Sequence, residues 1–366
     1  MNAYFYIYLI LSFSFIFPQN LTSLEANKAT KATDIPITTI KPDTNKVYPI
    51  AIIGTGAAGT MAMMRAVLNN NEVLVFSGAK QERRRSRGNW VRKVDNIPGL
   101  EKYERVVIDL RNETLKNLTQ NPLGNNLFLV DDSVVTLKKE EGVFKLTDGA
   151  GNTYSAEHVV LATGIMDEQP HIQGSIRPVL KYANGQTIAY CLICDGHRSF
   201  GKKTVVIGSS EEAANGALLL SEKYQLANLT LLTNGQELKI TQNTLDKMKA
   251  KNIIIENTKI EEVLGDKETK KLSGFKLEGG NIIPAEIAFV LLGIRANNQL
   301  ALQLGAQVDE RGLVITDPSG ESSVPNLFVD GDLRANSMKQ IYTAWQHAVD
   351  SLQTINKRLR EKKSAI

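Results

Sequence analysis

The sequence predicts an α/β protein with two Rossmann-like dinucleotide-binding domains, and three observations carry this prediction. A buried strand runs into a glycine-rich turn and a helix near residue 54, and the same order returns near residue 208. The two cysteines of the chain, Cys191 and Cys194, lie just before the second of these units. The 366 residues, 42% of them hydrophobic, are enough for two globular domains.

The first unit has the strand–helix–strand order of a dinucleotide-binding fold. Its segments are, in order, the strand Val47–Ile53, the turn 54–59 (GTGAAG), a helix over Thr60–Leu68 and a strand over Glu72–Phe76. In such a turn, Gly54 permits the tight bend, Gly56 lets backbone N–H groups approach a pyrophosphate, and Gly59 lets the helix pack closely on the strand. The helix N-terminus favours the anion. The unit therefore predicts a dinucleotide site.

The second unit repeats this order with a different turn. A strand over Thr204–Ile207 leads through residues 208–214 (GSSEEAA) into a helix that ends near Tyr224, and a strand over Leu229–Thr233 follows. The other expected elements are short strands over Asn126–Leu146, buried strands over His158–Thr163, Ile287–Leu292 and Val324–Val329, an antiparallel meander beyond Ile253, and a closing helix over Lys339–Lys357.

Charge and composition exclude some functions. A net charge of +4, without an aromatic and basic surface pattern, does not indicate nucleic-acid binding. The four histidines form no second ligand pair near the cysteines, so we expect no metal site.

The cysteines stand at the spacing of a redox disulfide, in Cys191-Leu192-Ile193-Cys194, and Asp195-Gly196 follows. The chain has no other thiol, so these two can bond only to each other. A C-x-x-C pair near a helix end can lower the pKa of one thiol towards neutrality, and the adjacent acid can move protons. The alternatives are two buried cysteines that act as small hydrophobes and an Asp195 that serves only the turn.

The N-terminus differs in kind from the rest of the chain. Residues Ala3–Phe17 are almost entirely apolar and aromatic, too short for a comfortable membrane span of roughly 20 residues and typical of a secretory signal. We expect a signal peptide or anchor over residues 1–23 and a polar, flexible linker over residues 24–46. The protein is then exported, periplasmic or secreted. A membrane anchor, or a cytoplasmic location if the segment is not a signal, is the alternative.

Taken together, the motifs resemble the thioredoxin reductase family, the low-molecular-weight branch of the FAD-dependent pyridine nucleotide-disulfide oxidoreductases. The resemblance covers roughly residues 47 to 358. The matching motifs, in family order, are GTGAAG at 54–59, NIPG at Asn96–Gly99, LATG at Leu161–Gly164, CLICDG at Cys191–Gly196, the Gly208 turn, and DGD at 330–332 with Lys339-Gln340 opening the last helix.

This resemblance implies a domain organisation and a set of site residues. Residues 47–166 and 293–358 would form a discontinuous FAD domain, and residues 167–292 an inserted NAD(P)-binding-like domain that carries the disulfide. The expected contacts to FAD are Gly54, Gly56, Ala57, Ala58, Gly59, Asn96, Thr163, Gly164, Gly331, Asp332 and Gln340. Among them, Asp332 would bind the ribityl or pyrophosphate region with help from Gln340. Gly208 would belong to the second nucleotide site.

The resemblance also implies an enzymatic role for the cysteine pair. Cys194 would accept electrons from reduced FAD, Cys191 would be the exposed nucleophile, and Asp195 would be the acid/base for the leaving thiolate. The expected activity is reduction of a thioredoxin-like partner or a small disulfide, by a homodimer as is usual in the family. The alternative is a flavin-dependent dithiol oxidase that passes electrons to oxygen.

The second turn departs from the family pattern G-x-G-x-x-A. Ser210 brings a Cβ to the place where the backbone should approach the pyrophosphate, and Glu211 and Glu212 bring negative charge. The segment Asn234–Leu238 has no Arg to bind a 2′-phosphate, and no acid ends the preceding strand to bind a ribose hydroxyl. We therefore expect an electron partner other than a nicotinamide, with NADPH or NADH as the alternative; an exported enzyme would meet no nicotinamide pool.

A basic run, Arg83-Arg84-Arg85-Ser86-Arg87, follows the second strand. It could cover the FAD phosphates, dock an acidic partner or be a solvated loop.

Overall fold

The structure, a computed structural model, describes residues 40–364. The predicted signal peptide lies outside the described residues, as does most of the predicted linker. The last part of that linker, residues 40–46, contacts the folded chain: Ile40 bridges Phe128, and Lys46 Nζ lies 2.5 Å from the carboxylate of Glu72. These contacts tie both ends of residues 40–46 to the part of the chain that forms the first sheet.

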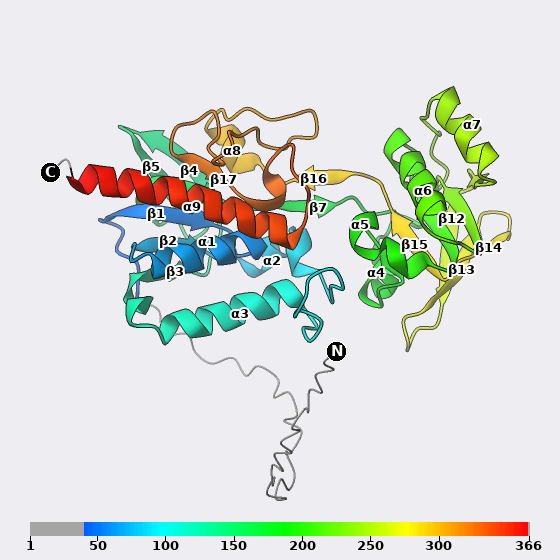
Figure 1. Ribbon diagram of the computed structural model, residues 1–366, viewed down its shortest axis with the longest axis horizontal. Coiled ribbons are helices and arrows are strands. Elements are labelled where there is room, and N and C mark those ends of the chain that lie inside the picture. Colours follow the sequence, from blue (N-terminus) through cyan, green and yellow to red (C-terminus); the bar gives the residue numbers. More distant parts are fainter. Residues whose placement is uncertain (1–39, 365–366) are drawn as a thin grey trace, which may run out of the picture. The chain divides into compact units, whose positions relative to one another are not determined.

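The first sheet has seven strands in the order β3-β2-β1-β6-β5-β4, with β17 also paired to β6 (Figure 1). The central strands are parallel, and β4, β5 and the start of β6 are antiparallel. The strands are β1 (Val47–Ile53), β2 (Val73–Phe76), β3 (Leu127–Val130), β4 (Val134–Glu140), β5 (Val143–Asp148), β6 (Thr153–Leu161) and β17 (Leu327–Val329). Because β17 pairs with the end of β6, the C-terminal part of the chain completes this sheet.

Helices α1, α3 and α9 pack beside one another on this sheet (Figure 1). The helices of this half are α1 (Ala57–Leu68), α2 (Lys80–Arg83), α3 (Val106–Thr119), α8 (Gln299–Gln303) and α9 (Ile341–Ser364). Helix α1 buries Ala58, Ala62 and Ala66, whose spacing of four residues places small side chains on one face, so α9 can approach closely. Helix α9 starts at Ile341, just after Gln340, and runs beyond the predicted end.

The second sheet has five parallel strands in the order β11-β10-β9-β15-β8. Its strands are β8 (Ile188–Ala189), β9 (Lys203–Ile207), β10 (Asn228–Leu232), β11 (Ile254–Glu256) and β15 (Ile287–Val290), and its helices are α4 (Arg177–Asn184), α5 (Leu192–Asp195), α6 (Glu211–Lys223) and α7 (Gln242–Ala250). An antiparallel meander, β12 (Ile260–Gly265), β13 (Leu272–Leu277) and β14 (Ile282–Pro284), lies beside it in sequence. The expectation that the meander begins just beyond Ile253 was wrong, because β11 pairs in parallel with β10.

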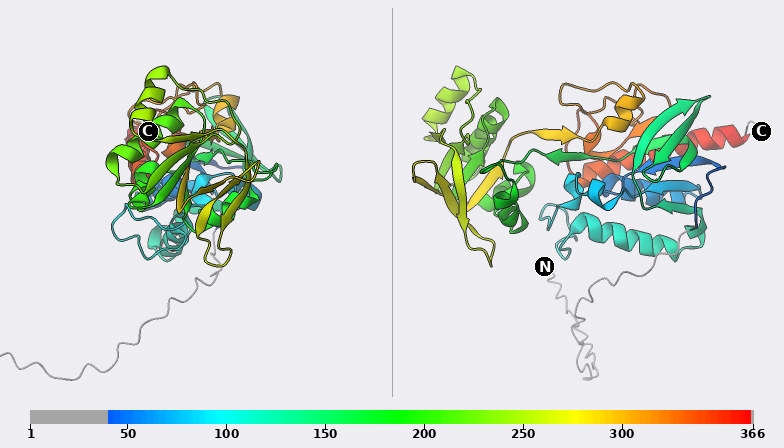
Figure 2. Two further views of the ribbon diagram at one scale, coloured as in Figure 1. Left: turned by 90° about the vertical axis from the view of Figure 1, so that its right-hand side faces the viewer. Right: turned by 180° about the vertical axis from the view of Figure 1, so that it is seen from behind.

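Two short antiparallel strands carry the chain between the sheets (Figure 2). Strand β7 (Ile165–Asp167) leaves the first sheet, and β16 (Ile294–Ala296) returns to it. The predicted boundaries of the inserted domain, residues 167 and 292, fall in or beside these strands. Within residues 40–364, no helix is both long and apolar enough to cross a bilayer.

Candidate disulfide and cofactor site

Cys191 and Cys194 form a disulfide, as the sequence predicts. Cys191 is the N-cap of the short helix α5, and its sulfur accepts a hydrogen bond from the backbone N–H of Cys194 at 3.2 Å. This single helical turn brings the two Cα atoms to 5.3 Å, within the range that a disulfide bridges.

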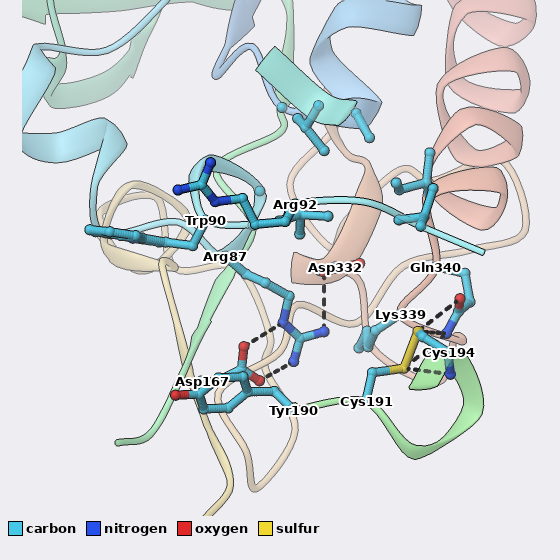
Figure 3. Close-up of a pocket in the computed structure, with 18 of the residues that line it drawn as sticks. Arg87, Trp90, Arg92, Asp167, Tyr190, Cys191, Cys194, Asp332, Lys339 and Gln340 are labelled. Carbon is cyan, nitrogen blue, oxygen red and sulfur yellow. Dashed lines mark hydrogen bonds and ion pairs between the residues drawn. A yellow bond between two sulfur atoms is a disulfide. The ribbon is translucent and has the colours of Figure 1, made fainter. Parts of the chain in front are cut away.

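Gln340 contacts this disulfide from the other half of the chain (Figure 3). Its Nε2 lies 3.4 Å from Cys194 Sγ and 3.6 Å from Cys191 Sγ. The side-chain amide of Asn96 donates to Gln340 Oε1 at 3.0 Å. Two residues predicted to contact FAD thus contact each other, and one of them contacts the disulfide.

A cavity of about 240 Å³ lies beside the disulfide. Most of the predicted site residues line it: Gly56, Ala57, Ala58, Asn96, Gly164, Cys191, Cys194, Asp195, Gly331, Asp332 and Gln340. A second cavity, of about 730 Å³, shares Gly56 with the first and is lined by Gly54, Thr163, Arg83 and Arg111. The two cavities together therefore follow the first glycine-rich turn, with the disulfide at one end.

In the first glycine-rich turn, Gly54 and Gly59 have no room for a side chain, whereas Gly56 borders open space. Gly54 has φ +104°, and a Cβ at Gly59 would lie 1.8 Å from the carbonyl oxygen of Gly54. A Cβ at Gly56, in contrast, would meet no atom within 4 Å. Helix α1, which starts here, has no side-chain cap and no acid in its first turn. Its free N–H groups and the open space at Gly56 fit the pyrophosphate of a dinucleotide such as FAD.

The remaining predicted contacts lie around this turn. Thr163 Oγ1 donates to the Asn297 carbonyl at 2.7 Å, which ties the loop after β6 to the segment after β16. Gly331 has φ +75°, and a Cβ there would lie 3.0 Å from that of Ala58, so a glycine lets this loop approach α1.

Arg87 joins two carboxylates in the wall of the first cavity (Figure 3). It pairs with both oxygens of Asp167, with Nε 2.8 Å from Oδ2, and its Nη1 lies 3.7 Å from Asp332 Oδ2. Burial raises the pKa of the Asp332 carboxyl, and the positive charges of Arg87 and Lys339 oppose that rise. The sequence pointed to Arg87 only as part of a basic run, and it gave no signal for Asp167.

Two further arginines of the basic run, Arg83 and Arg85, line the second cavity, and both are bonded to groups of the protein. Arg83 Nη1 donates to Asp131 at 2.6 Å and to the Gly78 carbonyl at 2.7 Å, and Arg85 lies 3.1 Å from Glu82. Arg111 of α3 lines the same cavity, and burial together with the nearby charge of Arg83 lowers the pKa of its guanidinium. An anionic group fits this cavity electrostatically.

Two titratable groups, Asp195 and Lys339, line the first cavity together with the disulfide. Burial raises the pKa of the Asp195 carboxyl, which lies 3.4 Å from Arg198 Nη1; Arg198 also binds Asp95 at 2.6 Å. Burial lowers the pKa of Lys339 to about 8, and its ammonium donates to the Arg334 carbonyl at 2.5 Å. A carboxyl with a raised pKa can hold a proton close to the cysteines.

The structure places Gly208 outside the lining of both cavities, directly after strand β9 of the second sheet. A Cβ there would lie 2.5 Å from the Leu291 carbonyl oxygen, so a glycine is needed for packing. The Ser210 hydroxyl accepts from the backbone N–H of Ala213 at 3.3 Å and caps α6, while Lys239 N–H donates to the Ser209 carbonyl at 2.7 Å. The Glu211 carboxylate accepts from the backbone N–H of Thr241 at 2.8 Å.

Comparison with known proteins shows what this chain is similar to. The family model "Pyridine nucleotide-disulphide oxidoreductase" matches residues 48–348. The thioredoxin reductase of Listeria monocytogenes is 28% identical over 308 residues, which are 82% of this chain and 90% of that protein. The one from Treponema pallidum is 26% identical over 302 residues, 81% of this chain and 92% of that protein.

The same likeness is present in three dimensions. The crystal structure of thioredoxin reductase from Streptococcus pyogenes has a TM-score of 0.74 and 20% identity, and the match covers 87% of this chain and 99% of that one. The predicted fold class, two Rossmann-like units, is thereby confirmed. Since the family match spans nearly the whole folded part, and a disulfide lies beside a cradle that fits FAD, the chain belongs to the pyridine nucleotide-disulphide oxidoreductase family as a thioredoxin reductase-like disulfide oxidoreductase.

Proposed function

We propose that the enzyme exchanges electrons between bound FAD and a disulfide or dithiol substrate through Cys191 and Cys194. One observation carries the proposal: the disulfide and the first glycine-rich turn line the same cavity. A dinucleotide whose pyrophosphate lies at Gly56 can therefore reach the sulfur atoms with its other end. When bound, FAD supplies the two-electron chemistry that no side chain can perform.

The residues of this chain would hold the cofactor along both cavities. The N-terminus of α1 would receive the pyrophosphate, and Asp332 would face the ribityl or pyrophosphate region. Arg83 and Arg111 supply positive charge at the far cavity, where the adenosine half would lie. The apolar residues of the first cavity wall, such as Ile165 and Ile188, would keep water from the reacting end.

In the reductive direction, the reduced cysteines would act in two exchange steps. The Cys191 thiolate attacks one sulfur of the substrate disulfide, and the other substrate sulfur leaves and takes a proton from Asp195. Cys194 then attacks the Cys191 sulfur of the mixed disulfide, which restores the Cys191–Cys194 bond and releases the second thiol. The raised pKa of Asp195 supports its role as the acid.

The substrate is proposed from chemistry and from the relatives. The named relatives are thioredoxin reductases, so a thioredoxin-like protein is the first candidate and a small dithiol or disulfide the second. By the same likeness we propose a homodimer. The apolar run at Ala3–Phe17 supports export as the location, and N-terminal sequencing of the protein from its native host would decide whether that segment is removed.

A second candidate, dithiol oxidation by oxygen, is supported by the second turn. The α6 N-terminus, where a nicotinamide dinucleotide would place its pyrophosphate, is capped by Ser210 and carries Glu211 and Glu212 in its first turn. A carboxylate in the first turn of α6 repels a phosphate bound at the helix N-terminus, because both are negatively charged and both are attracted to the same helix dipole.

Anaerobic stopped-flow spectroscopy of the flavin-loaded protein separates the candidates. We expect stoichiometric NADPH or NADH to leave the flavin oxidised and a dithiol to bleach it. Rapid restoration of the colour by air would favour the oxidase candidate, and a reduced flavin that persists in air until a disulfide substrate is added would favour the reductase candidate. Rapid bleaching by NADPH would refute the proposed loss of the nicotinamide site. The double variant Ser210→Gly/Glu212→Ser should gain some reactivity with NADPH, because it frees the α6 amides and removes one charge.

The central assignment has its own test. The Cys194→Ser variant should keep FAD bound and lose disulfide exchange. Full turnover by this variant would remove the cysteine pair from the mechanism.

A further inference from the structure

We propose that Gln340 is a catalytic residue: its side-chain amide donates a hydrogen bond to Cys194 and stabilises the thiolate that forms there when the disulfide opens. Asn96 would act as a positioning residue that keeps the amide in this orientation. The inference rests on the proposed exchange through the cysteine pair and names the group that controls its thiol chemistry.

The contact has only one possible donor. A disulfide sulfur carries no hydrogen, so it can only accept, and Gln340 Nε2 lies 3.4 Å from Cys194 Sγ (Figure 3). The Cys191 sulfur is a little farther, at 3.6 Å. Gln340 is only 7% exposed, so little water can compete for the amide. An N–H bond to a charged acceptor is stronger than one to a neutral sulfur, so the contact favours the thiolate.

The orientation of the amide depends on a second amide. Gln340 Oε1 lies at the same distance from Cys194 Sγ, 3.4 Å, but only Nε2 is also within reach of Cys191 Sγ, so rotation by 180° about the last bond would turn an acceptor towards Cys191 and take the donor away from it. Asn96 Nδ2 donates to that Oε1 at 3.0 Å and so opposes the rotation. Gln340 comes from the segment just before α9, and Asn96 from the loop before α3. Both helices pack against α1, which lies on the first sheet.

The chemistry balances with a dithiol as the reductant. A small dithiol such as dithiothreitol is oxidised to its cyclic disulfide, and its two electrons break the Cys191–Cys194 bond. Of its two protons, one stays on Cys191 and one goes to solvent when Cys194 remains a thiolate. Thiolate stabilisation at Cys194 therefore lowers the pKa of that thiol and makes the protein disulfide easier to reduce.

The test measures each thiol in the flavin-loaded protein after anaerobic reduction with dithiothreitol. The rate of alkylation by iodoacetamide is followed against pH, and mass spectrometry assigns it to Cys191 or Cys194. In the Gln340→Leu variant we expect the pKa of the Cys194 thiol to rise by about one unit and the equilibrium constant for reduction by dithiothreitol to fall about tenfold. Asn96→Leu should give a smaller shift in the same direction, because Gln340 then loses the hydrogen bond that holds its amide against the sulfur.

Two further variants keep the test decisive. Gln346→Leu is the matched control, since Gln346 lies on α9 close to Gln340 in sequence, lines neither cavity and donates to Asp350 at 2.8 Å; it should leave both quantities unchanged. If Gln340→Leu does not fold, Gln340→Glu retains the length of the side chain, and its carboxylate should raise the thiol pKa further.

An unchanged Cys194 pKa in the Gln340 variants would overturn the inference, as would an equal shift in the Gln346 control. Either result leaves the proposed function standing if Cys194→Ser still abolishes exchange. Conversely, turnover by Cys194→Ser would refute the proposed function, while the thiol pKa values would still report on Gln340.

Discussion

The two strand–turn–helix units share a topology but differ at the start of the helix. Helix α1 follows Gly56, with no side-chain cap and no acid in its first turn. Helix α6 follows Ser210, whose hydroxyl caps it, and its first turn carries Glu211 and Glu212. An anion site at a helix N-terminus needs free N–H groups and no competing negative charge. The N-terminus of α1 is therefore suited to an anionic ligand. At the N-terminus of α6, the hydroxyl of Ser210 already accepts a hydrogen bond from the helix.

The neighbouring segments strengthen this contrast. Gly56 faces open space in the wall of both cavities. At the second turn, Lys239 N–H donates to the Ser209 carbonyl, so the segment after β10 lies across the turn. Under the proposal above, one copy of the fold binds FAD and the other supports the disulfide without a nicotinamide ligand, so function must be argued from the site and not from the fold.

The largest expected effect comes from Gly59→Ala. The added Cβ would lie 1.8 Å from the Gly54 carbonyl oxygen, which is backbone and cannot move aside. We expect roughly 3 kcal/mol or more of lost stability and purification without flavin. The reciprocal change in the second unit, Ala213→Gly, should cost about 1 kcal/mol at most. Flavin absorbance and thermal unfolding measure both, and a flavin-loaded, fully stable Gly59→Ala protein would contradict the steric account.

Next in size is Arg87→Gln. The change leaves Asp167 and Asp332 without their shared cation in the wall of the first cavity, and we expect a loss of roughly 3 kcal/mol of stability. The flavin should also bind more weakly, because uncompensated carboxylates repel its pyrophosphate. Arg84→Gln is the matched control from the same basic run, since Arg84 is exposed and lines neither cavity. Equal flavin dissociation constants for the two variants would argue against a role for Arg87 at the cofactor.

The stability of the part of the molecule built on the first sheet should depend on pH, because Asp330 is buried there. Burial raises the pKa of Asp330 to about 7, whereas the unfolded chain releases that proton near its ordinary value of 3.8. The folded state therefore holds more protons between these values, and stability falls as the pH rises from about 4 to about 7. The Asp330→Asn variant cannot titrate, and its hydrogen bond with Ser351 can persist.

We expect Asp330→Asn to be more stable than the wild type by roughly 2 to 4 kcal/mol at pH 8 and nearly equal to it at pH 4. Denaturant unfolding at several pH values measures this difference. Burial lowers the pKa of His347 to about 4, which makes stability rise with pH in the overlapping range. That contribution is common to both proteins and cancels in the comparison. A difference that does not change with pH would refute the buried-acid explanation.

The smallest expected effect is that of Gly56→Ser, which gives the first turn the residue type found at the matching position of the second turn. Gly56→Ser places the capping hydroxyl of the second turn at the first, where a Cβ meets no atom. Folding should be unaffected, and the flavin dissociation constant should rise about tenfold, because the hydroxyl competes for the α1 amides. Equilibrium fluorescence of FAD measures it. Unchanged affinity would mean that those amides do not hold the cofactor.

Local patterns predicted much of the fold. The strand, turn and helix of the first unit, and the helix after Ser210, were placed within a few residues, because glycine geometry and helix periodicity act over short distances. The strand Ile254–Glu256 was placed in the wrong sheet, since nothing in its own residues specifies that its partner is β10. Helix α3 was not predicted from the sequence, although Arg111 on it lines the second cavity.

The sequence by itself determined the disulfide and the first glycine-rich turn. Both are local: two cysteines three positions apart close over one helical turn, and glycines at 54 and 59 meet within a single bend. Only the tertiary structure decided which groups surround them. Arg87 pairs with a carboxylate 80 positions away, and Gln340 contacts a sulfur 146 positions away. Arg87 meets Asp167 because β7 contacts the turn at Arg87–Asn89, and Gln340 reaches the disulfide because β17 pairs with β6 and so fixes the start of α9. No local pattern of charge or hydrophobicity specifies either meeting.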